Sequence, residues 1–206
     1  MKRFRFTLLA ICLVLLWLGW TDASLSLRNP EPATLPLAEL QREGAPREWL
    51  HVTGGYQDLQ NAISTSGTVK LEAFLVPMKT SPHADTFRVL VETRDPQILD
   101  LLRTYYFKLD SPAEQQRFLT EHAEAFHARR DVTGMLITGL IASGNRDKLM
   151  TLAKQLGMQV PEDVIFISEG KEPPSWRGFL FLALALAGLV KFGMMLRRKE
   201  PATPEK

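Results

Sequence analysis

Cysteine is almost absent from this chain of 206 residues, which contains only Cys12. Cys12 lies in an apolar run near the N-terminus, so residues 21–176 contain no cysteine. That region therefore has no disulfide, no thiol nucleophile and no thiolate metal site, and its stability must come from a hydrophobic core. About 150 residues are enough to bury such a core.

Histidine is also scarce, with four in the chain. Glu124 and His127 have the Glu-x-x-His spacing of di-iron carboxylate proteins, but such sites need a second copy, and the chain has one. His122 and His127 are five residues apart, whereas zinc-binding pairs on a helix are four apart. We therefore predict no metal site and expect His122 to pack in the core.

The motifs of common catalytic sites are missing as well. The chain has no Gly-x-Ser-x-Gly nucleophile elbow, P-loop or dinucleotide fingerprint, and the region between the apolar ends has no basic-aromatic patch for nucleic acid. We predict no catalytic residue, no cofactor and no nucleic-acid partner. The alternative is a membrane-anchored enzyme or small-ligand binder that uses the polar loops near Gly54 and His83, with His51 and Asp85 as candidate partners.

What the chain does have is a long apolar run at residues 178–196. Its first thirteen residues carry no charge, and a helix of this length spans roughly 28 Å, close to the hydrocarbon thickness of a bilayer. Lys191 lies near one end, where its side chain can reach the headgroups. Arg197, Arg198 and Lys199 follow at once and mark the cytoplasmic side. We predict a transmembrane helix and a cytoplasmic tail at residues 197–206.

A second apolar run follows the basic N-terminus at residues 1–5. It extends from Phe6 to Trp20, about 22 Å as a helix, which is short for a membrane span. We interpret residues 6–23 as a transmembrane anchor; the alternative is a signal peptide cleaved after Ala23. Cys12 is a poor lipoprotein site, and we expect its thiol to face lipid.

Charge predicts the topology. Residues 21–176 carry 16 Lys or Arg and 21 Asp or Glu, a net charge of −5, so the positive charge is concentrated at the two ends. Basic residues flanking membrane helices remain in the cytoplasm. We therefore predict an inner, cytoplasmic membrane protein whose central domain is periplasmic or otherwise extracytoplasmic.

Between the apolar runs, the pattern predicts a Pro-rich tether at residues 24–48, an α+β domain at residues 49–170 and a short linker at residues 171–177. Trp49–Thr53 reads as a strand that ends in a turn or bulge at Gly54-Gly55. Val69–Pro77 and Phe87–Val91 alternate in polarity, which predicts an antiparallel hairpin in which Pro77 either ends the pairing or lies at an edge.

The second half of the domain predicts helices and a βαβ unit. Asp95-Pro96 and Ser111-Pro112 are typical helix starts, and the second helix is expected to reach about Arg130. The apolar segments Val132–Ile141 and Val164–Ile167 flank a helix predicted to begin at Asn145. We expect these two strands to pair in parallel with a right-handed crossover.

The predicted fold class is therefore α+β: a mixed sheet, made of an antiparallel hairpin plus a βαβ unit, with about three helices and two flanking transmembrane helices. This layout is similar to that of the Surfeit-locus cytochrome oxidase assembly proteins. The likeness is one of layout, and no motif of that family occurs at either end, so it implies no residue roles. We expect a non-catalytic scaffold, assembly or interaction module whose partners are the bilayer and another membrane or periplasmic protein.

Overall fold

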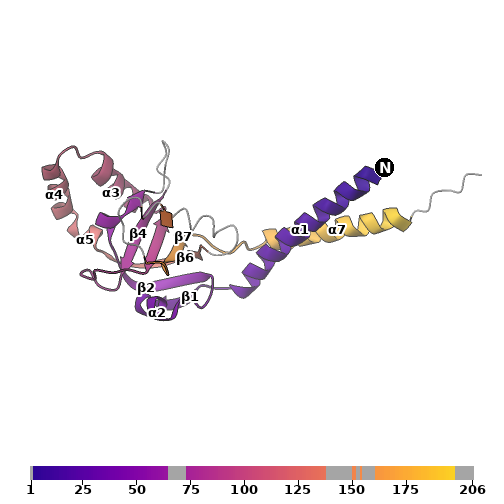
Figure 1. Ribbon diagram of the computed structural model, residues 1–206, viewed down its shortest axis with the longest axis horizontal. Helices are drawn as coiled ribbons and strands as arrows, with labels where there is room; N and C mark the ends of the chain where they lie inside the picture. The colour runs from indigo at the N-terminus through magenta and orange to yellow at the C-terminus, as the bar shows by residue number, and fades with distance from the viewer. Residues whose placement is uncertain (1, 65–72, 138–149, 152–153, 155–160, 198–206) are drawn as a thin grey trace, which may run out of the picture. The chain divides into compact units, whose positions relative to one another are not determined.

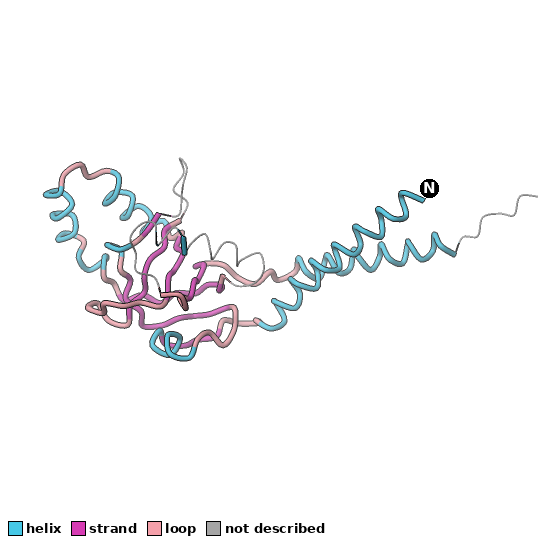
Figure 2. Tube along the Cα trace, viewed as in Figure 1, coloured by secondary structure: helices cyan, strands magenta, loops and turns pink. Residues whose placement is uncertain are grey.

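The computed structural model describes residues 2–64, 73–137, 150–151, 154 and 161–197. The chain forms two compact units, one made of residues 1–30 with 173–206 and the other of residues 31–172. The first is a pair of helices, and the second is a mixed α+β domain (Figure 1; Figure 2).

The first unit consists of α1 (Lys2–Arg28) and α7 (Arg177–Arg197). Both are long and apolar enough to cross a membrane, over Phe6–Arg28 and Arg177–Met195. The helix of α1 continues eight residues past Trp20, so it is longer than the apolar run alone indicated. That extra length removes the mismatch with the thickness of a bilayer.

Small residues allow α1 and α7 to pack closely in an antiparallel arrangement. A Cβ atom on Gly19 would lie 2.8 Å from the backbone nitrogen of Leu182, and one on Gly178 would lie 2.5 Å from that of Ala23. Close approach at small residues is the usual way in which membrane helices associate. The arrangement places the beginning of α1 and the end of α7 at the same end of the pair.

Two further contacts join the helices of this pair. Asp22 accepts a hydrogen bond from Arg177 Nε at 2.8 Å. Cys12 is buried, and a Cβ atom on Gly188 would collide with its sulfur. The prediction of a lipid-facing thiol was therefore wrong, because the missing side chain of Gly188 leaves room for Cys12 between the helices.

The second unit is built on a mixed seven-stranded sheet with the order β1-β2-β6-β7-β5-β4-β3. The strands are β1 (Ala33–Pro36), β2 (Trp49–Gln57), β3 (Ile63–Ser64), β4 (Phe74–Lys79), β5 (Val89–Thr93), β6 (Arg129–Leu136) and β7 (Ile165–Glu169). β1 runs parallel to β2 and β5 parallel to β7, whereas the other pairs are antiparallel.

The sheet also closes on itself, because β2 pairs with β4 through Tyr56↔Lys79 and Gln57↔Met78. The strands β2, β6, β7, β5 and β4 therefore form a closed ring. The close approach of β6 and β7 needs Gly134, since a Cβ atom there would collide with the backbone carbonyl of Ser168. A glycine inside a strand often marks such a close approach of two backbones.

The predicted βαβ unit is wrong, because its two strands do not pair in parallel. β6 and β7 pair antiparallel, through Gly134↔Glu169, Met135↔Ser168 and Leu136↔Ile167, and β7 instead finds a parallel partner in β5. A helix between two strands permits a parallel crossover but does not require one, because a long connection can also return antiparallel. The predicted helix starting at Asn145 lies mostly outside the described residues.

β4 and β5 pair antiparallel, as predicted, but the pairing continues through Pro77, which lies opposite Leu90. The Pro77 carbonyl accepts a hydrogen bond from the Asp58 backbone N–H at 2.9 Å. Its peptide groups thus face away from β5, so the missing N–H removes no bond from that ladder. The pairing therefore does not end at Pro77, and of the two predicted alternatives the first was wrong.

The segment predicted as a tether contributes β1 and α2 (Leu37–Glu43) to the domain. Leu37 and Leu40 of α2 are fully buried among the side chains of β2, β5, β6 and β7. The compact unit accordingly begins at Glu31, not at residue 49. The prolines suggested an extended linker, but Pro36 precedes the helix, where it costs no hydrogen bond.

On the other side of the strands lie α3 (Pro96–Phe107), α4 (Pro112–Glu121) and α5 (Ala123–Phe126) (Figure 1). The predicted caps are confirmed: Asp95 accepts a hydrogen bond from the Gln97 N–H, and Ser111 with Glu114 forms a capping box. The second helix does not reach Arg130, because it is interrupted at His122 and the chain enters β6 at Arg129.

Candidate functional site: a polar pocket at the carboxyl ends of two parallel strands

A pocket of about 830 Å³ opens where β5 and β7 end. Its walls are two short segments, residues 94–97 after β5 and residues 168–171 at the end of β7. Because β5 and β7 are parallel, their carboxyl ends meet at one edge, and α3 begins there. Loops at the carboxyl ends of parallel strands are where α/β proteins commonly bind ligands.

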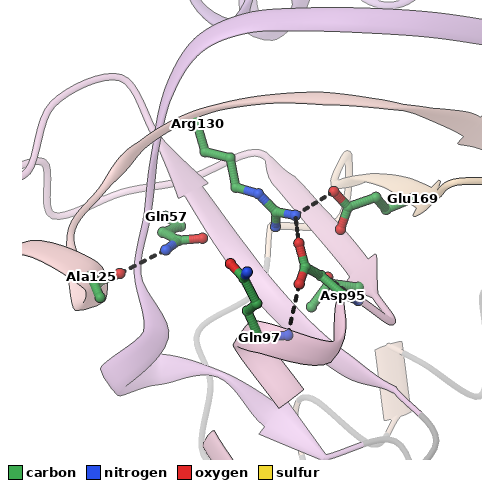
Figure 3. A network of polar contacts seen from close by, with 7 residues as sticks. Gln57, Asp95, Gln97, Ala125, Arg130 and Glu169 are labelled. Carbon is green, nitrogen blue, oxygen red and sulfur yellow. Dashed lines mark hydrogen bonds and ion pairs between the residues drawn. The ribbon is translucent and has the colours of Figure 1, made fainter. Parts of the chain in front are cut away.

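Two of the lining residues, Asp95 and Glu169, form a triad with the side chain of Arg130 (Figure 3). Arg130 Nη2 donates to Asp95 Oδ2 at 2.9 Å and to Glu169 Oε1 at 2.6 Å. The side chains of Arg130, Asp95 and Glu169 are only 20%, 33% and 17% exposed. Two carboxylates and one guanidinium give the triad a net charge of −1, in a setting where water screens charge poorly.

Strand alternation explains how a charged triad comes to lie beside the core. Arg130 is two residues from Val132 and Glu169 is two residues from Ile167, so each pair shares one face of its strand. Val132 and Ile167 belong to the same apolar cluster. The triad therefore forms the polar rim of an apolar interior.

Two buried oxygen atoms beside the triad have no hydrogen-bond partner: Gln57 Oε1 and Glu169 Oε2. Gln57 is only 5% exposed, and its Nε2 donates to the Ala125 carbonyl at 2.6 Å, which fixes the amide. Its free oxygen points toward Gln97 and Arg130 (Figure 3). Buried acceptors normally have a donor, so these two atoms cost the fold stability; neither oxygen is accessible to solvent, and Gln57 does not line the pocket.

The outer wall carries positive charge. Arg94 is exposed and ion-paired with Glu92 at 3.1 Å, and Lys171 is exposed. Glu92 also accepts a hydrogen bond from Ser168 Oγ at 2.7 Å. Burial raises the pKa of Glu92, but the hydrogen bonds from Ser168 and Arg94 and the nearby Lys171 outweigh it and hold the pKa below its usual value.

A second buried ion pair holds the ring together where β2 ends. Lys79 Nζ lies 2.6 Å from Asp58 Oδ2, and Asn61 donates to the same oxygen at 2.9 Å. Burial raises the pKa of Asp58, but the hydrogen bonds and charge of Lys79 and the hydrogen bonds from Asn61 outweigh this effect, so the pKa lies below its usual value. Tyr106 lies nearby and donates to the Gln60 carbonyl at 2.7 Å, and burial raises its pKa to about 12.

The residues of the predicted alternative site do not converge. His51 Nδ1 lies 2.7 Å from Thr133 Oγ1, its cross-strand neighbour. His83 and Asp85 are exposed in the loop between β4 and β5, and no described hydrogen bond or ion pair links them to His51. Gly54 has a φ of 72° and forms the predicted bulge, where its N–H donates to Asp131 at 2.8 Å. His51 and Gly54 thus have partners within the sheet, and the described contacts bring neither of them to His83 or Asp85.

Among the described residues, no group of three or more His, Cys, Asp or Glu side chains is placed to hold a metal ion. His122 packs edge-on against Phe118, with ring centroids 4.3 Å apart, as expected of a histidine beside the core.

Sequence reasoning missed Arg130 and Glu169. The helix from Ser111 was expected to reach Arg130, which disguised the strand, and the last strand was expected to end before Glu169. One signal was available, because Val132 and Gly134 alternate with Asp131 and Thr133 in the manner of a strand, and Arg130 lies on the same face as Val132.

The chain was compared with protein families, curated proteins and solved structures. No protein-family model, no curated protein and no solved structure matches the chain.

Proposed function

We propose that this chain is a non-catalytic interaction or assembly module, anchored in a bacterial inner membrane by α1 and α7, whose α+β domain lies on the extracytoplasmic side. The antiparallel packing of the two apolar helices supports this topology, as do the basic residues at both ends of the chain. The partner is another membrane or extracytoplasmic protein.

One observation carries the proposal: the domain holds an aromatic surface that its own core does not cover. We call the end of α3 together with α4, residues 103–121, the α3–α4 arm. Tyr106 is 36% exposed and Phe107 59% exposed, and they are the exposed large apolar side chains among the described residues of the domain. Exposed aromatic residues that lie together are typical of protein contact sites.

The helix α4 strengthens this inference. It buries none of its residues, although its capping box and N-terminal proline favour the helical state. In Figure 1 it lies away from the strands. Phe118 and Leu119 of α4 pack against the core, but both stay partly exposed, so the helix gains limited stability from the fold, since packing supplies most helix stability in proteins. A partner that covers the arm would add to that packing.

The base of the arm is packed against the core. Tyr105 packs edge-on against Tyr106 at 4.9 Å and against Phe126 at 5.2 Å. Phe126 is fully buried, so this aromatic cluster connects the exposed rings to the core. An aromatic anchor that is already ordered loses little conformational entropy on binding.

The membrane topology can be tested with reporter fusions in the full chain. Alkaline phosphatase, which is active only outside the cytoplasm, is fused at Ser111, and a reporter active only in the cytoplasm is fused after Lys206. We expect both to be active. A silent phosphatase fusion with normal protein levels would contradict the proposed topology.

The contact surface can be tested by site-specific photocrosslinking in membranes. A photoreactive phenylalanine analogue is placed at Phe107 and, as a control, at Arg42, whose side chain is 76% exposed on α2. We expect a discrete crosslinked species from position 107 that Tyr106→Ser greatly reduces, and none from position 42. Equal crosslinking from both positions, or none from position 107, would argue against the arm as the contact site.

A further inference from the structure

We propose that the helix pair binds an anionic phospholipid through the phosphate of its headgroup, at the end where α1 begins and α7 ends (Figure 1). We call this the basic end. The proposal rests on the membrane placement of α1 and α7 proposed above and goes beyond it, because a bilayer anchor needs no particular lipid. The site is separate from the α3–α4 arm, which belongs to the other compact unit.

The contacts between the two helices determine which residues lie at the basic end. Gly19 of α1 lies against Leu182 of α7, and Gly188 of α7 lies against Cys12. Each step toward the start of α1 is therefore matched by a step toward the end of α7. Continued to the helix ends, this register places the beginning of α1 level with Arg197, the last residue of α7. The basic residues thus brought to one level are Lys2, Arg3, Arg5 and Arg197.

No acidic residue of either helix neutralises this charge. Residues 1–21 and 178–199 contain no Asp or Glu. The first acidic residue of α1 is Asp22, at the opposite end of the pair, where it already bonds to Arg177. With the helices in a bilayer, the basic end lies among the headgroups, whose phosphates form charge-assisted hydrogen bonds with Lys and Arg. An unbalanced group of cations favours lipids of net negative charge over zwitterionic lipids.

Lys191 extends the site into the apolar surface of α7. It is exposed, and it lies about 9 Å deeper along the helix than Arg197. Its neighbours Val190 and Met194 are 64% and 65% exposed, as expected of side chains that face lipid. Among the described residues no ion pair involves Lys191. A lysine at this depth needs a counterion, and its flexible side chain can reach the phosphate of a lipid that lies beside α7.

The tryptophans of α1 support this depth. Trp17 and Trp20 are 59% and 67% exposed, and tryptophan side chains of membrane proteins gather at the interfaces. The helix from Arg3 to Trp20 is roughly 26 Å long, close to the hydrocarbon thickness of about 30 Å. With the tryptophans at one interface, the basic end therefore reaches the other, and Lys191 lies just inside it.

Reconstitution of the full-length protein in nanodiscs with equal amounts of phosphatidylglycerol and phosphatidylcholine tests the proposal. Native mass spectrometry of the released protein shows which lipid stays bound. We expect phosphatidylglycerol to be retained at least about fivefold more than phosphatidylcholine, the effect of one contact between a basic residue and an anionic lipid. Insertion with equal retention of both lipids would overturn the lipid site and leave the membrane anchor intact. Failure to insert at all would overturn the anchor, and the lipid site with it.

Variants at Lys191 locate the bound lipid. Lys191→Met removes the charge and leaves an apolar side chain on a lipid-facing surface, so the helix pair should stay folded. We expect it to lower the preference for phosphatidylglycerol roughly fivefold, and Lys191→Arg to keep it. Arg28→Met is the matched control, because it removes an exposed basic residue from the other end of α1. A preference that Lys191→Met leaves unchanged, or that Arg28→Met lowers equally, would overturn the assignment of the site.

Discussion

The two ends of the strand ring are built in opposite ways. At the amino ends of β5 and β7 the opening is sealed by α2, whose Leu37 and Leu40 are fully buried. Arg88 helps to hold α2 in this place, because it donates hydrogen bonds to the Gln41 carbonyl of α2 and to Asp163 beside β7. At the carboxyl ends, the same two strands finish in the charged triad and an open pocket.

The difference separates an end that stabilises the domain from an end that costs it stability. The sealed end gains free energy by removing apolar side chains from water. The open end keeps charged side chains and unpartnered acceptors beside the core, which costs stability. Such a cost is common where a surface serves binding. The contrast between the ends can be measured, because changes at each should act on different properties.

The largest effect is expected at the sealed end. Leu40→Ala removes a side chain with no solvent exposure and leaves a cavity between α2 and the sheet. We expect a loss of about 2–5 kcal/mol in the free energy of unfolding. Glu39→Ala, exposed on the same helix, should change it by less than about 0.5 kcal/mol. Unfolding of the full chain in micelles, followed by tryptophan fluorescence, compares the two, and equal losses would mean that α2 is not part of the core.

A slightly smaller effect is expected where β6 meets β7. Gly134→Ala would drive a methyl group into the Ser168 backbone carbonyl, and a backbone group cannot rotate away as a side chain can. We expect a destabilisation of about 1–3 kcal/mol. Gly170→Ala is the comparison, since its φ of 71° is strained for alanine but no atom lies within 4 Å of the added carbon. A smaller loss at Gly134 than at Gly170 would contradict the observed strand contact.

The arginines at the two ends offer a matched comparison. Arg130→Met keeps the apolar stem but leaves Asp95 and Glu169 without a cation, and we expect a loss of about 1–2 kcal/mol. Arg88→Met at the sealed end should cost less than about 1 kcal/mol, because its side chain is 41% exposed and water can replace its bonds. Thermal unfolding of both variants measures the difference. The same loss in both would show that the triad is no more important to the fold than a surface pair.

The smallest effect is a dependence on pH at the open end. The pKa of Glu92 is lower in the folded chain than in the unfolded chain. Its contribution is therefore complete above the unfolded pKa of about 4.3 and is lost as the pH falls through the folded value. Glu92→Gln should cost about 0.5–1 kcal/mol at pH 7 and progressively less as the pH is lowered toward 3. A constant difference across that range would contradict the lowered pKa.

The most accurate predictions from the sequence concern features that depend on adjacent residues alone. The Asp95 and Ser111 caps were correct because a helix start depends on three or four adjacent residues. Val89 is fully buried, as its alternation with Arg88 predicted, but Arg88 is not the free surface residue that the same alternation suggested. Its partners are 47 and 75 residues away in the sequence, and alternation carries no information about them.

Pairings over long distances account for most of the remaining errors. Neither the direction of β7 relative to β6 nor the closure of β2 onto β4 is encoded in local polarity, because each depends on how the whole ring packs. The triad was missed for the same reason, since Asp95, Arg130 and Glu169 come from three segments. From the local sequence, Asp95 was predicted to be a helix cap, Arg130 the end of a helix and Glu169 a residue after the last strand.

The burial of Ala23 bears on how the protein is made. A signal peptidase that cuts after Ala23 needs this stretch extended, yet here it is helical and lies against Gly178 of α7. Asp22 and Arg177 are 155 residues apart, and at common rates of synthesis that distance takes roughly 8–30 s to translate. We therefore expect any cleavage after Ala23 to precede the packing of α7 against α1, because the packed helices bury Ala23.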